Sequence, residues 1–177
     1  MDSLTENIAS WFFLATIIER LTEMVVSKRN KVWSLNQGGV EYGADHYKLM
    51  VGMHVLFFVA ILVEFLWFGS GVPPQVRLGA VVVGIFCQMT RVWIIQTLGK
   101  QWNTRVIIVP ALTRVLTGPY RFLNHPNYVV VATEMVALPL VFGAWRTAIV
   151  FTVLNAWMMI VRIGVENHAL AKLKNDE

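Results

Sequence analysis

The sequence predicts an all-α, polytopic membrane helix bundle, and three observations point to this fold class. Of the 177 residues, 56% are hydrophobic, and the mean hydropathy is +0.56. The apolar residues gather in five segments that approach the about 20 residues a helix needs to cross a bilayer. Basic residues gather between alternate segments, which is typical of the cytoplasmic loops of multi-pass proteins. Since no internal repeat, low-complexity stretch or long linker divides the chain, residues 1–177 are expected to form one integral membrane domain.

The five predicted spans differ in how well they suit a membrane. They cover residues 8–26, 48–68, 76–98, 128–142 and 145–165. The first contains Glu19, Arg20 and Glu23, which interrupt the apolar run of a signal peptide, so we expect a retained helix whose charges compensate one another. Glu64 in the second has no evident partner. The fourth is short, and Pro139 near its end is expected to kink it.

The basic residues predict an orientation for these spans. Those assigned to one side are Lys28, Arg29, Lys31, Lys48, Lys100, Arg105, Arg114, Arg121, Lys172 and Lys174. The other side offers only Arg77 and Arg146. The positive-inside rule therefore predicts an external N-terminus and a cytoplasmic C-terminus, in agreement with an odd number of spans. The net charge of +4 is then mainly a topology signal, with some attraction to anionic lipid, and does not indicate nucleic-acid binding.

The segment between the third and fourth spans, residues 99–127, is unusual for a membrane loop. It contains the β-like apolar stretch "WNTRVIIVP", followed by "LTRVLTGPYRFL". One interpretation is a segment that rests on the lipid interface, which favours the amphipathic rings of Trp102 and Tyr120. The alternative is a segment that folds over the cytoplasmic mouth of the bundle. Because loops on a rigid scaffold commonly carry function, the working face is expected to be cytoplasmic.

Ionisable residues inside the predicted spans indicate a polar interior, because charges at membrane depth normally face a bundle interior and pair there. The third span has Gln88 and Arg91 on one face, and the fourth has Glu134. A polar stripe follows the fifth span at spacings of four, three and four residues: Asn155, Met159, Arg162 and Glu166. One interpretation of Arg162 and Glu166 is a simple intrahelical ion pair. The other is a shared polar site, in which Glu134 reaches from the fourth span toward Arg91 and Arg162.

The junction before the fourth span, "GPYRFLNHPNY", concentrates turn-forming, aromatic and basic residues. His125 precedes Pro126, which favours an extended residue followed by the first turn of a helix. On local grounds His125 is equally well explained as a residue that begins a helix. The other histidines and Cys87 lack the spacing of a metal site, and no Walker or GxGxxG motif is present. These absences exclude a soluble-type nucleotide-binding fold.

This junction, with "TLGKQWNTRVIIVP" before it and "RIGVENHAL" after the hairpin, resembles the isoprenylcysteine carboxyl methyltransferase family of integral membrane enzymes. The resemblance covers about residues 91–170 in the family's order and spacing. The small size is similar to bacterial members, including those associated with methylation of alkylpyrone polyketides. The resemblance implies a multi-pass protein of the bacterial inner membrane with a cytoplasmic active site. It also implies S-adenosylmethionine as the methyl donor and S-adenosylhomocysteine as a product.

The resemblance further implies roles for individual residues. His125, Pro126 and Tyr128 match the family's cofactor-contacting motif, and Glu166 matches the first residue of its usual Glu-Glu pair. The second residue of that pair is Asn167 here, which keeps an acceptor oxygen but supplies no charge. The complete set of expected cofactor-binding residues is Tyr120, Arg121, His125, Pro126, Tyr128, Glu166 and Asn167.

The methyl acceptor is expected to be a hydrophobic, lipid-like small molecule, because such a substrate explains a membrane location. Its tail would enter sideways along the apolar faces of spans two to four. Methyl transfer mainly requires that the nucleophile and the methyl group be held in line. For a carboxylate or acidic enol, Arg91 or Arg162 would orient the anion and Glu134 the arginine. For a neutral hydroxyl or amine, Glu134 or His125 is the candidate base.

Two other functions stay open on the sequence. A phospholipid N-methyltransferase would use the same cofactor in a membrane, and a methylated amine head group would distinguish it. A non-catalytic membrane subunit would retain the scaffold, and the departure from the family pattern at Asn167 is its best support.

Overall fold

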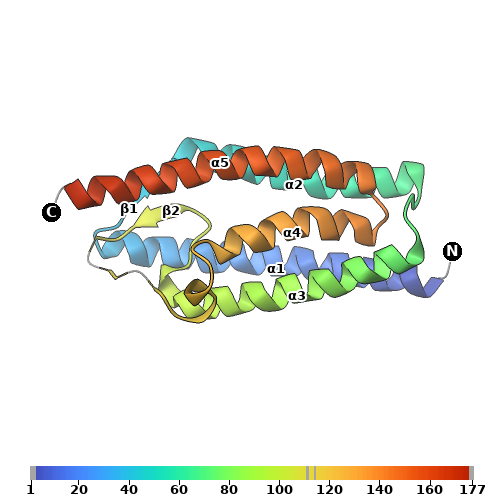
Figure 1. The fold of residues 1–177 in the computed structure, drawn as a ribbon, viewed down its shortest axis with the longest axis horizontal. Helices are drawn as coiled ribbons and strands as arrows, with labels where there is room; N and C mark the ends of the chain where they lie inside the picture. Colours follow the sequence, from blue (N-terminus) through green and yellow to red (C-terminus); the bar gives the residue numbers. More distant parts are fainter. Residues whose placement is uncertain (1–2, 111, 114, 176–177) are drawn as a thin grey trace.

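Five helices and one pair of short strands make up the fold in a computed structural model that describes residues 3–110, 112–113 and 115–175, without the side chains of 3–6 and 170–175. The helices are α1 (Ser3–Asn36), α2 (Ala44–Phe68), α3 (Pro74–Leu98), α4 (Pro126–Val141) and α5 (Trp145–Asn175). The strands are β1 (Val40–Tyr42) and β2 (Val106–Ile108), and two short 3-10 helices are η1 (Gly99–Gln101) and η2 (Gly118–Arg121). Figure 1 shows the helices along one long axis, with the strands and the C-terminus at the end opposite the N-terminus.

All five predicted helices are confirmed as helices, and three of them suit a membrane span. By length and composition, α2, α3 and α5 can cross a bilayer. Helix α1 has 34 residues, about 51 Å at 1.5 Å per residue, but it carries charged residues along its length, and α4 has only 16 residues. Large apolar side chains cover the outer surface, and Leu66, Trp67 and Ile160 are each more than 70% exposed, at 76%, 77% and 72%. Such a surface is typical of helices that contact lipid.

Two buried charged residues, Glu64 and Arg77, connect the helices at the end of the bundle that contains the α4–α5 turn. The carboxylate of Glu64 accepts hydrogen bonds from the backbone N–H groups of Arg146 at 3.0 Å and Thr147 at 2.7 Å, and from the Thr147 hydroxyl at 2.7 Å. Arg77 Nε donates to the carbonyl oxygen of Val141 at 2.9 Å, at the end of α4. Each charge has the sign that stabilises the helix terminus it contacts. Glu64 therefore has partners, which its sequence context does not reveal because two of them are backbone amides.

Proline and glycine shape that turn. Pro139, expected to kink the fourth helix, lies in the last turn of α4, which ends two residues later at Val141. Gly143 has a φ of 75°, and a Cβ there would lie 2.5 Å from the Ser70 hydroxyl oxygen. The predicted hairpin of the last two helices is thus confirmed, with a close approach to the α2–α3 connection.

The loop between α3 and α4 folds back onto the bundle instead of resting on lipid. Its strand β2 pairs antiparallel with β1, and Val40 lies opposite Ile108. The Asn30 side-chain amide donates to the carbonyl oxygens of Gly99 at 3.1 Å and Trp102 at 2.7 Å. Trp102 is 3% exposed, so the interpretation that places its ring at the lipid interface does not hold for this residue. The loop therefore covers one end of the bundle, as the second interpretation expected, and the all-α class gains a small two-stranded sheet.

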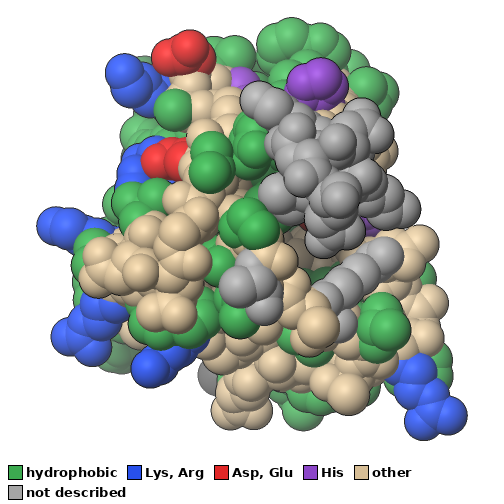
Figure 2. Space-filling view, turned by 90° about the vertical axis from the view of Figure 1, so that its left-hand side faces the viewer, with side chains coloured by type: hydrophobic (Ala, Val, Ile, Leu, Met, Phe, Trp, Pro, Cys, Tyr) green, Lys and Arg blue, Asp and Glu red, His purple; other side chains and the backbone are tan. Residues whose placement is uncertain are grey.

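The same end of the molecule carries most of the basic residues. Figure 2 shows Lys and Arg side chains around its rim. Lys28, Arg29 and Lys31 lie on the last turns of α1, and Lys100 and Arg105 lie in the loop after α3. Arg114 and the side chains of Lys172 and Lys174 fall outside the described residues.

Candidate active site

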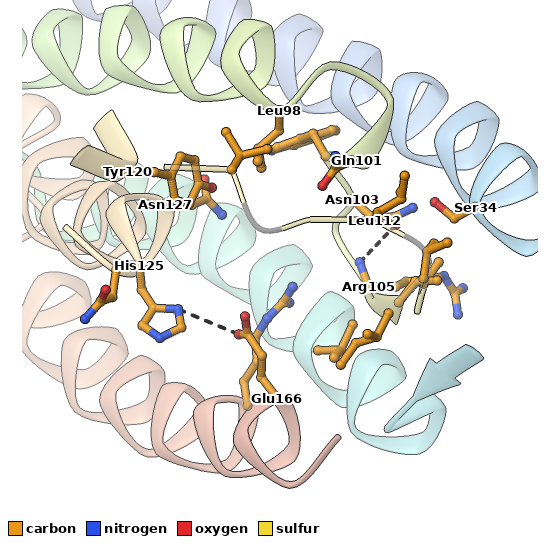
Figure 3. Close-up of a pocket in the computed structure, with 18 of the residues that line it drawn as sticks. Ser34, Leu98, Gln101, Asn103, Arg105, Leu112, Tyr120, His125, Asn127 and Glu166 are labelled. Atoms are coloured by element: carbon orange, nitrogen blue, oxygen red, sulfur yellow. Dashed lines mark hydrogen bonds and ion pairs between the residues drawn. The ribbon is translucent and has the colours of Figure 1, made fainter. Parts of the chain in front are cut away.

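A cavity of about 510 Å³ lies at the strand end of the bundle, beneath β2 and the loop that follows it. Its other walls come from the end of α3, the junction before α4 and the C-terminal half of α5. Figure 3 shows side chains from these segments directed toward one another across the cavity. Of the residues expected at the site, those that line it are Tyr120, His125, Tyr128, Arg162, Glu166 and Asn167.

The hydroxyl group of Tyr128 joins the residues of α4 and α5 at this cavity. It donates a hydrogen bond to Glu166 Oε2 at 2.5 Å and accepts one from Arg162 Nε at 3.1 Å. His125 Nδ1 lies 3.8 Å from the same Glu166 oxygen, and its ring stacks on Tyr128 with centroids 5.1 Å apart. Among the described residues, none donates a hydrogen bond to Glu166 Oε1, and Arg162 makes no ion pair with Glu166. The simple intrahelical ion pair is therefore replaced by a bridge through Tyr128.

Tyr120 forms an inner wall of the cavity. It packs against the buried cluster of Cys87, Ile94, Trp102 and Val130. Burial raises the pKa of its phenol to about 12, and the nearby Glu166 carboxylate adds to this shift. Tyr120 therefore keeps its proton near neutral pH and presents an uncharged aromatic surface.

Two of the expected cofactor-binding residues do not reach the cavity. Arg121 is exposed at the end of η2, and its guanidinium carbon lies 5.9 Å from the ring centroid of Phe122. Pro126 is fully buried in the first turn of α4, where its ring suits the first helical position. Pro126 thus sets where α4 begins, which directs the neighbouring His125 and Tyr128 into the cavity.

A second polar cluster lies deeper in the bundle, where α1, α3 and α4 meet. Arg91 forms the predicted ion pair with Glu134, and both side chains are nearly buried. Arg20 Nη2 also contacts Glu134, at 2.9 Å, and Arg20 Nη1 contacts Glu23 at 2.7 Å. Arg91 Nε lies 3.4 Å from Glu23 Oε1. The expected compensation within the first helix is confirmed for Arg20 and Glu23, and these two residues also pair with Glu134 and Arg91 of the neighbouring helices.

Arg162 does not join that deeper cluster. Its Nη1 lies 3.0 Å from the sulfur of Met50, and its Nε contacts Tyr128. The expected single site of Glu134, Arg91 and Arg162 is thus divided into two. Helix α4 explains the division, because Tyr128 and Glu134 are six residues apart and point to different neighbours.

A polar stripe along α1 was missed in the sequence. Its members are spaced alternately by four and three residues: Thr16, Arg20, Glu23, Ser27, Asn30 and Ser34. This spacing places all of them on one helical face, and it was available as a signal. Arg20 and Glu23 pair with α4 and α3, whereas Ser27 contacts the Thr104 hydroxyl at 2.7 Å and Ser34 lines the cavity. Helix α1 therefore both anchors the loop and holds the buried ion pairs.

One carboxylate adds ion pairs to the backbone pairing of the two strands that cover the cavity. Glu41 of β1 forms ion pairs with Lys31 at 2.5 Å and with Arg105, whose guanidinium stacks 3.9 Å from the Tyr47 ring centroid. Partial burial opposes ionisation of Glu41, but the hydrogen bonds and charges of Lys31 and Arg105 outweigh it and lower its pKa. Arg105 also lines the cavity, so this contact connects the covering sheet to the site.

An apolar groove between α4 and α5 adjoins the cavity. Its walls are mainly apolar and come from Leu123, Val129, Ala132, Thr133, Val136, Met159 and Ile163. Asn124, His125 and Tyr128 line both the groove and the cavity. The sequence led us to expect an apolar path along spans two to four, whereas this groove uses α4 and α5.

The chain is similar to known proteins over most of its length. The uncharacterized protein YpbQ of Bacillus subtilis is 37% identical over 161 residues, which cover 90% of this chain and 95% of that protein. An uncharacterized protein of Haemophilus influenzae is 24% identical over 162 residues, which cover 91% of this chain and 94% of that protein. The sequence model of the isoprenylcysteine carboxyl methyltransferase (ICMT) family matches residues 80–172, which include α4, the loop before it and most of α5.

Proposed function

Because the chain belongs to the isoprenylcysteine carboxyl methyltransferase family, and so is an integral membrane methyltransferase, we propose that it methylates an oxygen of a lipid-like acceptor with S-adenosylmethionine. The oxygen belongs to a carboxyl or hydroxyl group. The observation that carries this proposal is the junction of a polar cavity with an apolar groove at His125 and Tyr128. A water-soluble donor and a hydrophobic acceptor can meet only where two such surfaces join.

The cavity has the groups that the cofactor needs. Its volume falls within the roughly 300–1,000 Å³ of small-molecule sites. Glu166 Oε1 is available to accept a hydrogen bond from the ammonium group, while Oε2 is held by Tyr128. The face of Tyr120 suits a cationic sulfonium, and the apolar residues 106–109 suit the adenine ring. When bound, S-adenosylmethionine supplies an electrophilic methyl group.

Asn167 lines this cavity beside Glu166, so the departure from the family's Glu-Glu pair lies within the proposed site. Its amide oxygen can accept one hydrogen bond, although without the attraction of a full charge. One carboxylate is enough to bind one ammonium group. We therefore favour an enzyme over a non-catalytic subunit.

Arg162 supports an oxygen acceptor over an amine. Among the described residues its guanidinium contacts Tyr128 and Met50 but no carboxylate, so a positive charge lines the cavity without direct neutralisation. This charge attracts a carboxylate or an enolate and repels an ammonium head group. We assign to Arg162 the role of orienting the acceptor oxygen, and to Arg91 and Glu134 a positioning role.

A neutral hydroxyl acceptor would also require a base. His125 is the candidate, because its Nδ1 faces Glu166, which favours a proton on that nitrogen and leaves Nε2 able to accept one. A carboxylate acceptor would need no base. The two cases predict different pH profiles of methyl transfer.

The orientation in the membrane follows from the basic residues at the cavity end. The positive-inside rule favours a cytoplasmic position for Lys28, Arg29 and Lys100, and the cavity opens at the same end. A cytoplasmic site also gives access to the pool of S-adenosylmethionine in a bacterial cell.

The test uses the full-length protein in lipid nanodiscs. Calorimetry should detect binding of S-adenosylhomocysteine, and incubation with isotopically labelled donor and a bacterial lipid extract should yield an O-methylated product by mass spectrometry. Absence of binding by the folded protein would contradict the proposal. A methylated amine head group would favour the phospholipid N-methyltransferase, and binding without any methylated product would favour a non-catalytic subunit.

A further inference from the structure

Asn127 lines the cavity, and the proposed function assigns it no part in binding the cofactor or the acceptor. It lies in the first turn of α4, between Pro126 and Tyr128. Figure 3 shows its side chain directed into the cavity beside Tyr120. Arg91 Nη1 donates a hydrogen bond to Asn127 Oδ1 at 3.4 Å. This contact directly links the deep ion cluster to the cavity.

The chemistry of arginine decides which way the Asn127 amide faces. A guanidinium group has donors and no acceptor, so only the amide oxygen can face Arg91. The two N–H donors on Nδ2 must then point away from Arg91. No described residue accepts a hydrogen bond from Asn127 Nδ2, although its amide is only partly exposed. The side chain therefore offers two donors, and no acceptor, to whatever occupies the cavity.

The deep cluster holds Arg91 in the position that this orientation needs. The Arg91 side chain is 3% exposed and lies between the carboxylates of Glu134 and Glu23. These two contacts fix the position of the guanidinium. If the Asn127 amide were flipped, its NH2 group would face the N–H groups of Arg91, which is an unfavourable contact between two donors.

We propose that Asn127 binds a carboxylate oxygen in the cavity through Nδ2, and that Arg91 acts as a positioning residue that keeps this amide turned toward the ligand. The proposal rests on the proposed function and deepens it. The carboxylate belongs either to the amino-acid part of the cofactor or to the methyl acceptor. Both ligands present the same chemistry to the amide.

The replacements Asn127→Asp and Asn127→Ala distinguish this role from a structural one. Aspartate keeps the shape and gives Arg91 a stronger partner, but it removes both donors and repels a carboxylate. Alanine removes the donors without adding a charge. If Asn127 binds a carboxylate, affinity falls from wild type to Asn127→Ala and further to Asn127→Asp. If it only satisfies Arg91, Asn127→Asp binds like wild type and Asn127→Ala is the weaker variant.

Calorimetry with two ligands identifies the source of the carboxylate. The probes are S-adenosylhomocysteine and its decarboxylated analogue, and the exposed Asn36→Asp is the matched control. For a cofactor carboxylate, Asn127→Asp should weaken S-adenosylhomocysteine binding about ten- to a hundredfold and change binding of the analogue little. For an acceptor carboxylate, it should leave both dissociation constants unchanged and raise the KM for labelled methyl transfer to a bacterial lipid extract.

The result that overturns this proposal is wild-type behaviour of Asn127→Asp with both probes and with the lipid extract. Thermal unfolding of each variant in nanodiscs checks that it is folded, and Asn127→Ala supplies a second reading if Asn127→Asp is not. Failure of the wild-type protein to bind S-adenosylhomocysteine would instead remove the proposed function, so the two failures are distinguishable.

Discussion

At the scale of single residues, Tyr128 decides how the polar groups of the site are arranged. Its hydroxyl lies between Glu166 and Arg162, which would otherwise be free to pair directly on α5. The Tyr128 hydroxyl thus separates the Glu166 carboxylate from the Arg162 guanidinium, and it binds only one of the two carboxylate oxygens. This arrangement leaves the second carboxylate oxygen for a cation and the guanidinium for an anion, which are the two charges that the proposed ligands carry.

Replacing Glu166 with glutamine tests that division. Glutamine keeps the size but loses the charge that would bind an ammonium group, and a hydrogen bond to a charged group contributes about 1.5–3 kcal/mol. Affinity for S-adenosylhomocysteine should therefore fall about ten- to a hundredfold, as measured by calorimetry. The exposed Asp45→Asn is the matched control. Equal affinities in wild type and Glu166→Gln would show that the ammonium is bound elsewhere.

At the scale of elements, the two short strands act as a cover for the cavity. Three residues in each strand bury too little surface to be stable alone, so the pair depends on side chains. Glu41 supplies that support through Lys31 and Arg105, and the α1 residues Ser27 and Asn30 hold the loop before β2. We therefore expect the stability of the strand pair to depend on the charge of the Glu41 carboxylate.

The ionised form of Glu41 should hold the strands together. Since its pKa is lowered in the folded protein, its stabilisation is complete above the ordinary glutamate pKa of about 4.3 and is lost as the pH falls through the lowered value. Acidification below about pH 4 should speed hydrogen exchange at residues 106–108, after correction for the intrinsic rate. Glu41→Gln should show the faster exchange already at neutral pH. If acidification speeds exchange equally in Glu41→Gln, another group is responsible.

At the scale of the whole molecule, the cluster of Arg20, Glu23, Arg91 and Glu134 joins three helices that are far apart in the chain. Two positive and two negative charges balance inside the bundle. Removing one partner of a buried pair leaves an uncompensated charge, whereas removing both partners can be nearly neutral. The cluster should therefore show strong coupling between substitutions.

We compare the stability of the single variant Glu134→Met with that of the double variant Glu134→Met and Arg91→Met. The single variant leaves two arginines against Glu23 and should lose about 3–5 kcal/mol of stability. The double variant leaves the balanced pair of Arg20 and Glu23, so its thermal unfolding in nanodiscs should lie nearer that of wild type. A double variant no more stable than Glu134→Met would mean that packing, and not charge, determines stability there.

The orientation of the bundle can be tested with single cysteines, because Cys87 is the one cysteine in the sequence and is buried. Gln37 is exposed at the cavity end, and Gln75 is exposed at the opposite end. In intact bacterial cells, a membrane-impermeant maleimide should label Gln75→Cys and leave Gln37→Cys unlabelled. Both should react after lysis. The reverse pattern would place the cavity outside.

The positions of the helices could be predicted from the sequence, but the pairing of the strands could not. Hydrophobic runs, prolines and glycines locate all five helices and the α4–α5 hairpin, because those features depend on near neighbours in the chain. The β character of "VII" in β2 was readable as well. Its partner β1 was not, since three residues carry little pattern and their pairing joins segments about 65 positions apart.

The candidate site could likewise be predicted only in part. Sequence determined the class of protein and the residue types at the junction before α4, and the resemblance directed attention to His125, Tyr128 and Glu166, which the cavity brings together. The packing of the helices, which the sequence does not show, pairs Arg91 and Glu134 with α1, leaves Arg121 outside the cavity and lets Asn127 connect the two polar regions. The physical reason is that a buried charge takes the partner that packing places within reach, and that partner can lie anywhere in the chain.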